Sequence, residues 1–68
     1  MKNGQKISII PSVALTEMGL ERLIGRNARI SEILERPDGT VRGCWAVLEG
    51  EPYEGEQEWY LPFSSFIE

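Results

Sequence analysis

Side chains that could carry out chemistry are few in this sequence. It contains no histidine, so it lacks the usual general base, the usual partner of a serine or cysteine nucleophile, and the commonest ligand of transition metals. Its one cysteine, Cys44, stands between Gly43 and Trp45 in a run of strand-forming residues, which favours a buried structural thiol. We therefore expect a non-catalytic protein, with no catalytic residues and no cofactor.

Glutamates crowd the segment 49–58, which reads EGEPYEGEQE. Carboxylate oxygens bind Ca²⁺ in proteins, but this segment lacks the fixed spacing and the Asp and Asn residues of a calcium loop. We predict an exposed, solvated loop that holds no metal ion. Its negative charge could also attract a basic partner surface by long-range steering.

Charge is distributed unevenly along the chain. Residues 1–42 hold all seven Lys and Arg beside five acids, a net charge of +2, whereas residues 43–68 hold six Glu and no base, a net charge of −6. An acidic chain is a poor non-specific ligand for nucleic acid. Two interpretations of the bases stay open: scattered surface charges, or a local nucleic-acid patch formed by Lys6, Arg22, Arg26 and Arg29.

Aromatic residues cluster at the end of the chain, where EWYLPFSSFIE holds four of the six. If Leu61 faces the core, alternation along a strand places Trp59 on the same face and Tyr60 on the other. We predict an outward set that binds a protein or peptide: Tyr53, Tyr60, Pro62 and Phe66. The alternative is that these rings cover the open ends of the fold and touch no partner. Trp45 and Phe63 fit either core or surface.

The first of the elements that must position these residues is a strand at residues 5–10. Pro11 ends it by withholding a ladder donor, and Ser12 can cap a helical turn. The long connection 13–24 shows partial helical spacing, which predicts one or two short helical turns. Gly25 stands where a helix commonly ends.

Three strands joined by hairpins are predicted next. Residues 27–36 form a strand with a bulge or strong bend near Ser31 and Glu32, because the apolar face changes phase there. The turn Pro37-Asp38-Gly39 joins it to a strand at 40–48, and a further strand follows at 58–61. A tight helical turn and a last short strand complete the chain.

Five short strands, with a long first connection and a one-turn helix before the last strand, are the plan of the SH3-like small barrel. The ending LPFSSFIE resembles the corresponding passage of SH3 domains with one extra residue, and GRNARISEI at 25–33 resembles the start of the KOW type found in ribosomal and transcription proteins. The resemblance implies an all-β, five-stranded SH3-like small barrel with a short helical turn in the first long loop. It also implies that Leu61 and Ile67 face the core, while Pro62 and Phe66 face outward.

The chain departs from both families in ways that bear on function. It has no aromatic-rich passage like the ALYDY of signalling SH3 domains, and it is more acidic than KOW proteins. It resembles short bacterial proteins of the fold more than a eukaryotic signalling module. We expect a binding or adaptor module that engages a protein partner, with a nucleic-acid accessory barrel as the alternative and the oligomeric state open.

Length and composition set the remaining expectations. The chain has room for a single domain, residues 1–68. No apolar run reaches the length of a transmembrane helix. The apolar stretch in the start MKNGQKISIIPS is also shorter than the hydrophobic segment of a signal peptide. A lone cysteine agrees with a reducing compartment. We therefore expect a cytoplasmic protein without a membrane partner.

Overall fold

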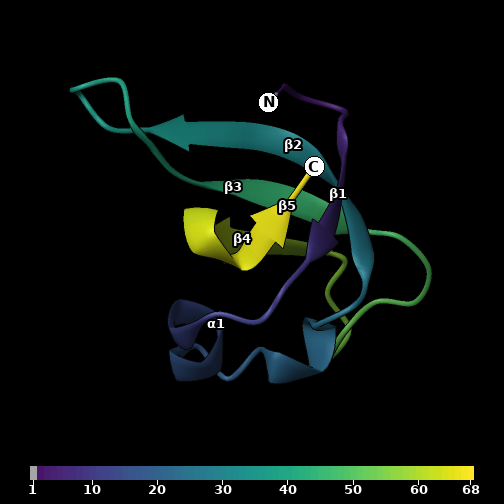
Figure 1. Ribbon diagram of the computed structural model, residues 1–68. Helices are drawn as coiled ribbons and strands as arrows, with labels where there is room; N and C mark the ends of the chain where they lie inside the picture. Colours follow the sequence, from purple (N-terminus) through teal and green to yellow (C-terminus); the bar gives the residue numbers. More distant parts are fainter. Residues whose placement is uncertain (1) are drawn as a thin grey trace.

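Five antiparallel strands form one sheet in the order β4-β3-β2-β1-β5 in the computed structural model, which describes residues 2–68 (Figure 1). The strands are β1 Lys6–Ile9, β2 Asn27–Glu35, β3 Val41–Leu48, β4 Glu58–Pro62 and β5 Phe66–Ile67. The prediction of a mainly β protein is confirmed, and each predicted strand is present within one or two residues of its expected ends. Within the described residues, β4 and β5 do not pair with each other, so the sheet is open between them.

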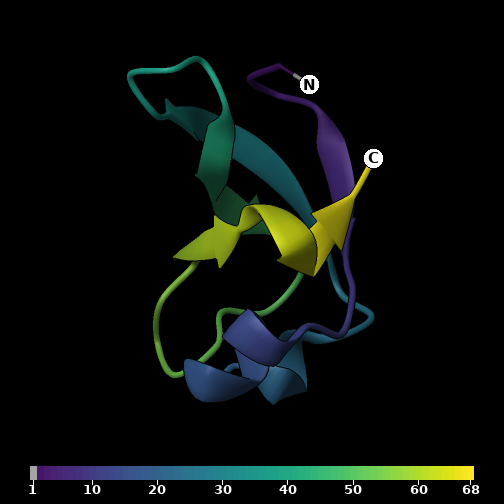
Figure 2. The same ribbon diagram turned by 60° about the vertical axis from the view of Figure 1, so that its left-hand side comes forward.

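The first long connection carries two short helical elements, as predicted. These are α1 Val13–Glu17 and the 3₁₀ turn η1 Glu21–Leu23, which lie together at one end of the sheet (Figure 1, Figure 2). Ser12 caps α1, because its Oγ accepts a hydrogen bond from the Leu15 N–H at 3.0 Å. Gly25 then adopts a φ of 89°, a left-handed conformation that glycine reaches without the clash of a Cβ atom.

A bulge bends β2 where the change of phase predicted it. Ile30 pairs with Ala46 and Glu32 pairs with Trp45, so Ser31 is an extra residue with no partner of its own in β3. A bulge of this kind kinks a strand and strengthens its twist. The first half of β2 thereby pairs with both β1 and β3, while its second half extends into the hairpin that projects from the body of the molecule (Figure 1).

The core lies on one side of the sheet, under the helical connection. In β3 every second residue from Cys44 to Leu48 is buried, as strand alternation requires. Leu15 and Leu23 close the core from α1 and η1. Among residues 2–68, twelve apolar residues are buried: Ile7, Ile9, Leu15, Leu20, Leu23, Ala28, Ile30, Cys44, Ala46, Leu48, Leu61 and Phe66.

The two side chains of the last strand, β5, face the opposite sides of the sheet from those expected. Phe66 is only 5% exposed and Ile67 is 54% exposed, so the prediction that Phe66 faces outward and Ile67 inward is wrong. Phe66 lies opposite the core residue Ile9 in the ladder, and directly opposed residues share a face of the sheet. The one extra residue relative to the SH3 passage explains the error, because a shift of one residue moves every side chain to the other face.

The 3₁₀ turn η2, Phe63–Ser65, ties the end of the chain to its first long connection. Ser65 is fully buried, and its Oγ lies 2.6 Å from the Oγ of Ser12. The Ile10 N–H also donates to the Ser65 carbonyl at 2.9 Å. These contacts hold η2 against the residues that precede α1, and they set the direction in which β5 leaves the turn.

Candidate partner-binding face

An apolar surface lies on the side of β3 and β4 that points away from the core. Trp45 and Tyr60 are opposed in the ladder, and their rings meet edge-on with centroids 6.0 Å apart and planes at 68°. Trp45 is 39% exposed, Val47 is similarly exposed, and Tyr60 and Pro62 are half-buried. We call these four residues, Trp45, Val47, Tyr60 and Pro62, the aromatic face.

Gly43 explains how the Tyr60 ring is seated. A Cβ atom at this position would lie 2.3 Å from the Leu61 carbonyl oxygen and 2.9 Å from the Tyr60 hydroxyl. The absence of a side chain therefore lets β4 come close and leaves room for the tyrosine above the strand. The Tyr60 hydroxyl completes the arrangement by donating to the Arg42 carbonyl at 3.4 Å.

Two carboxylates border the aromatic face. Glu32 lies opposite Trp45 on β2, and Glu58 lies opposite Val47 on β4. The Glu58 Oε2 is 2.5 Å from the Ser31 Oγ, which also lies 3.1 Å from the Trp45 carbonyl. A hydroxyl has one proton, and a carboxylate is the stronger acceptor, so Ser31 donates to Glu58. The bulge residue of β2 thus holds Glu58 across β3.

Only two of the four residues predicted to bind a partner belong to this face, Tyr60 and Pro62. Tyr53 lies elsewhere, because its ring packs on Trp59 with centroids 5.5 Å apart, and both rings rest against the core. Phe66 is buried, so its side chain is not presented to a partner. The predicted inward positions of Leu61 and Trp59 agree with the structure, Leu61 being fully and Trp59 partly buried.

Two members of the aromatic face, Trp45 and Val47, are not among the residues predicted to bind a partner. Both sides of β3 carry apolar residues, so alternation alone left Trp45 undecided. Gly43, Trp45 and Val47 share one side, and no local pattern in the sequence distinguishes it from the side of Cys44, Ala46 and Leu48. The other undecided ring, Phe63, lies at the surface and is 51% exposed.

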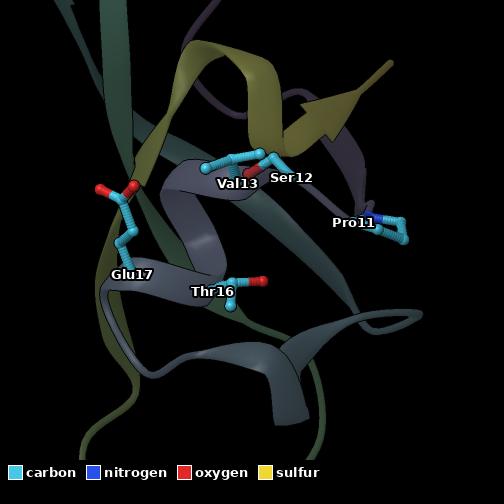
Figure 3. Close-up of a pocket in the computed structure, with 5 residues that line it drawn as sticks. All are labelled: Pro11, Ser12, Val13, Thr16 and Glu17. Atoms are coloured by element: carbon cyan, nitrogen blue, oxygen red, sulfur yellow. The ribbon is translucent and has the colours of Figure 1, made fainter.

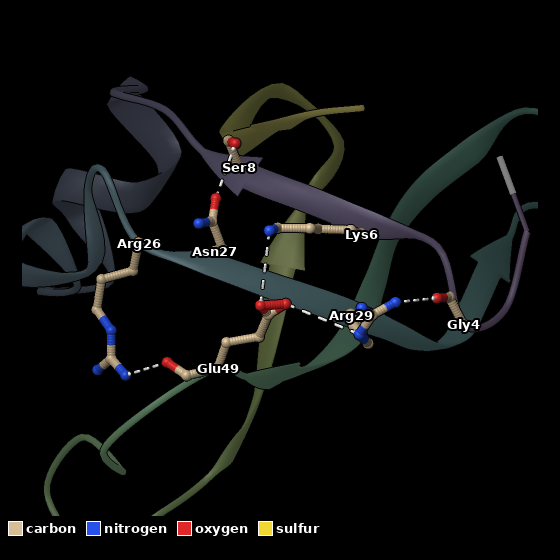
Figure 4. Close-up of polar contacts among 7 residues, drawn as sticks. All are labelled: Gly4, Lys6, Ser8, Arg26, Asn27, Arg29 and Glu49. Carbon is tan, nitrogen blue, oxygen red and sulfur yellow. Dashed lines mark hydrogen bonds and ion pairs between the residues drawn. The ribbon is translucent and has the colours of Figure 1, made fainter.

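Most of the predicted basic patch is engaged with a single segment of the chain (Figure 4). Glu49 lies between two of the bases, with its Oε2 3.9 Å from the Lys6 Nζ and its Oε1 3.7 Å from the Arg29 Nε. Arg29 also donates through Nη1 to the Gly4 carbonyl at 3.2 Å. The charges of Lys6 and Arg29 are therefore partly offset within the protein.

Arg26, the third predicted base, fastens the loop that follows β3. Its Nη2 donates to the Glu49 carbonyl at 2.9 Å and to the Glu51 carbonyl. Arg22, by contrast, is exposed in η1. The four bases thus do not form one continuous patch of unengaged charge, and nucleic-acid binding stays a prediction that a low-salt oligonucleotide titration can test.

Cys44 is the structural thiol that its sequence position indicated. Its side chain is fully buried, and desolvation by burial raises the pKa of the thiol to about 11. A thiol is a poor nucleophile until it ionises, so Cys44 stays unreactive at neutral pH. Residues 2–68 contain no cluster of three or more His, Cys, Asp or Glu placed to hold a metal ion. The helices of the same residues are too short to cross a membrane.

Two shallow grooves flank the helical elements. One has a volume of about 410 Å³ beside α1 and is lined by Pro11, Ser12, Val13, Thr16 and Glu17 (Figure 3). The second, of about 270 Å³, is lined by Phe63, Phe66, Ile67 and Glu68. Both linings are mainly apolar, and the Ser12 hydroxyl in the first groove is engaged with the Ser65 Oγ and the Leu15 N–H.

Comparisons of the chain with models of protein families, with curated proteins and with solved structures found no match.

Proposed function

We propose that this protein is a non-catalytic binding module that engages a partner protein through the aromatic face. The observation that carries the proposal is the Trp45–Tyr60 pair, two rigid rings packed edge-on and partly exposed on the side of the sheet away from the core. Aromatic side chains dominate the binding energy of many protein interfaces, because they supply a large contact area at a small cost in conformational entropy.

The chemistry of the chain supports binding over catalysis. There is no histidine, and the one thiol is buried and protonated at neutral pH. Ser31 donates to the Glu58 carboxylate at the border of the aromatic face, but both side chains are exposed and no histidine is present to activate the hydroxyl.

For the fold, we propose an SH3-like small barrel. Three features support it: β1 lies between β2 and β5, β2 bends at the Ser31 bulge so that it serves both halves of the sheet, and η2 precedes the closing strand. A fold of this kind hosts many unrelated functions, so the aromatic face, and not the fold, supports the proposed function.

The proposal is tested by comparing exposed aromatics on two different surfaces. Wild-type protein captures binders from an extract of the source cell, and a purified binder is then titrated calorimetrically against Trp45→Ala, Tyr60→Ala and Phe63→Ala. We expect Trp45→Ala to weaken binding about tenfold or more, as for a central interface aromatic, and Phe63→Ala to bind like wild type. Unchanged binding by both Trp45→Ala and Tyr60→Ala, with circular dichroism showing folded variants, would overturn the proposal.

A further inference from the structure

Two carboxylates lie beside the exposed part of the aromatic face. Glu32 and Glu58 occupy the outward positions beside Trp45 and Val47, and both are exposed. The nearest base in the ladder, Arg29 opposite Val47, is turned to Glu49 and the Gly4 carbonyl (Figure 4). An incoming group on Trp45 therefore meets an indole ring and two carboxylates.

A guanidinium group satisfies both features at once. Cations are attracted to the face of an aromatic ring, and tryptophan is the best of the three rings for this interaction. Guanidinium is planar and weakly hydrated, so it stacks on the ring while its N–H groups donate to carboxylates at the ring's edge. An ammonium group is a compact, strongly hydrated point charge and gains less from stacking.

We propose that the aromatic face binds an arginine side chain of the partner, stacked on Trp45 with Glu32 and Glu58 as its counter-charges. This inference rests on the proposed function and names the chemistry of the partner. Ser31 contributes as a positioning residue, because its hydrogen bond at 2.5 Å holds the Glu58 carboxylate over β3. The net charge of −6 on residues 43–68 adds long-range attraction for a basic segment.

The same charges disfavour other occupants. A second copy of the chain would bring its own Glu32 and Glu58 to the contact if the two faces met around a two-fold axis, and like charges repel. An acidic segment or a nucleic-acid phosphate would meet the same repulsion. The occupant that these charges favour is therefore a basic, arginine-bearing segment of another protein.

The two tryptophans provide the readout of the test. In ¹H–¹⁵N spectra each tryptophan gives a separate indole N–H signal. Trp59 is an internal control, because it lies outside the aromatic face and its Nε1 donates to the Glu56 carbonyl at 3.0 Å. The protein is titrated with an acetylated, amidated tetra-arginine peptide, and with tetra-lysine and tetra-glutamate peptides of the same length. We expect tetra-arginine to shift the Trp45 signal to saturation, to bind at least about threefold tighter than tetra-lysine, and to leave Trp59 in place.

Variants in which a glutamate is replaced by glutamine distinguish a defined arginine site from non-specific electrostatic attraction to the acidic protein. Glu32→Gln and Glu58→Gln together should weaken tetra-arginine binding about threefold or more, while Glu54→Gln, which removes a charge from the distant loop tip, should have less than half that effect. Equal shifts of both indole signals, equal affinity for tetra-lysine, or equal losses in the Glu54→Gln and double variants would each overturn the inference.

Failure of the inference and failure of the proposed function give different results. If a captured binder loses affinity for Trp45→Ala but not for the Glu32→Gln/Glu58→Gln double variant, the aromatic face binds a partner but not through arginine. If Trp45→Ala and Tyr60→Ala both bind the captured partner normally, the proposed function fails, whatever the peptides show.

Discussion

At the scale of single residues, the contacts that matter most are those made by small polar groups inside the fold. Ser12 and Ser65 meet across 53 positions of sequence, and Ser65 is fully buried. Ser12 serves two elements, since its Oγ also caps α1. A buried hydroxyl without a partner destabilises a protein, so the Ser65 hydroxyl depends on Ser12.

Removing the serines singly and together tests this dependence. Ser12→Ala should lower the free energy of unfolding by about 1–3 kcal/mol, because the cap is lost and the Ser65 hydroxyl stays buried without a partner. The double variant Ser12→Ala/Ser65→Ala should be less destabilised than the sum of the two single variants, as measured by urea unfolding. Additive losses would show that the two hydroxyls do not interact.

The buried thiol of Cys44 makes a second prediction at this scale. Its pKa is raised from 9.0 to about 11 by burial, so between these values the unfolded chain releases a proton that the folded protein keeps. The unfolded state then binds fewer protons, and stability should fall as the pH rises above about 9. In urea unfolding from pH 8 to 11, Cys44→Ala should lose less stability than wild type. Parallel losses in the two proteins would contradict the raised pKa.

At the scale of elements, the loop between β3 and β4 is more ordered than a run of glutamates indicated. Residues 50–56 are exposed except Tyr53, as predicted, but Tyr53 and Glu56 form a bridge with hydrogen bonds of 3.0 and 2.9 Å in both directions. Between them Glu54 has a φ of 50° and Gly55 a φ of 80°. Two positive φ values define a type I′ turn, for which Asn-Gly is the favoured pair.

Replacing the strained glutamate should therefore stabilise the protein. Glu54→Asn should raise the free energy of unfolding by about 0.5–1 kcal/mol, because asparagine tolerates the left-handed conformation better than glutamate. Glu51→Asn, which has a negative φ and removes the same charge, is the matched control for lost repulsion within the acidic loop. Equal gains in thermal denaturation of the two variants would assign the effect to charge and not to the backbone.

At the scale of the whole molecule, Arg26 joins parts of the chain that local contacts leave separate. It stands just before β2 and donates to two carbonyls of the loop after β3, while the Arg26 carbonyl accepts from the Ile9 N–H at 2.9 Å. The planar guanidinium reaches both loop carbonyls at once, which a lysine ammonium on a flexible stem matches poorly. One side chain thereby fixes the acidic loop against the first connection.

Arg26→Lys should loosen that loop while leaving the sheet intact. We expect faster amide hydrogen exchange at Tyr53 and Glu56, whose N–H groups close the turn, and a loss of stability of about 1–2 kcal/mol. Arg22→Lys, at an exposed position in η1, is the control and should behave like wild type. Unchanged exchange at Tyr53 and Glu56 in Arg26→Lys would show that the loop is held by other contacts.

Local sequence determined the features that depend on a few neighbouring residues. The Ser12 cap, the turn at 37–39, the bulge at Ser31 and the five strands are set by backbone preferences and by alternation within one segment, so they could be predicted. Cys44 was predictable for the same reason, because a small apolar residue in a strand interior is usually buried.

Tertiary structure alone decided which faces and which charges meet. Which of Phe66 and Ile67 faces the core depends on pairing with β1, more than fifty residues earlier in the chain. Which face of the sheet Trp45 occupies relative to the core depends on the position of α1 and η1. Lys6 and Arg29, two members of the predicted basic patch, pair with Glu49 because β1 and β2 place them beside it. Alternation specifies that neighbouring side chains point to opposite faces, but only packing between distant segments specifies which face becomes the core.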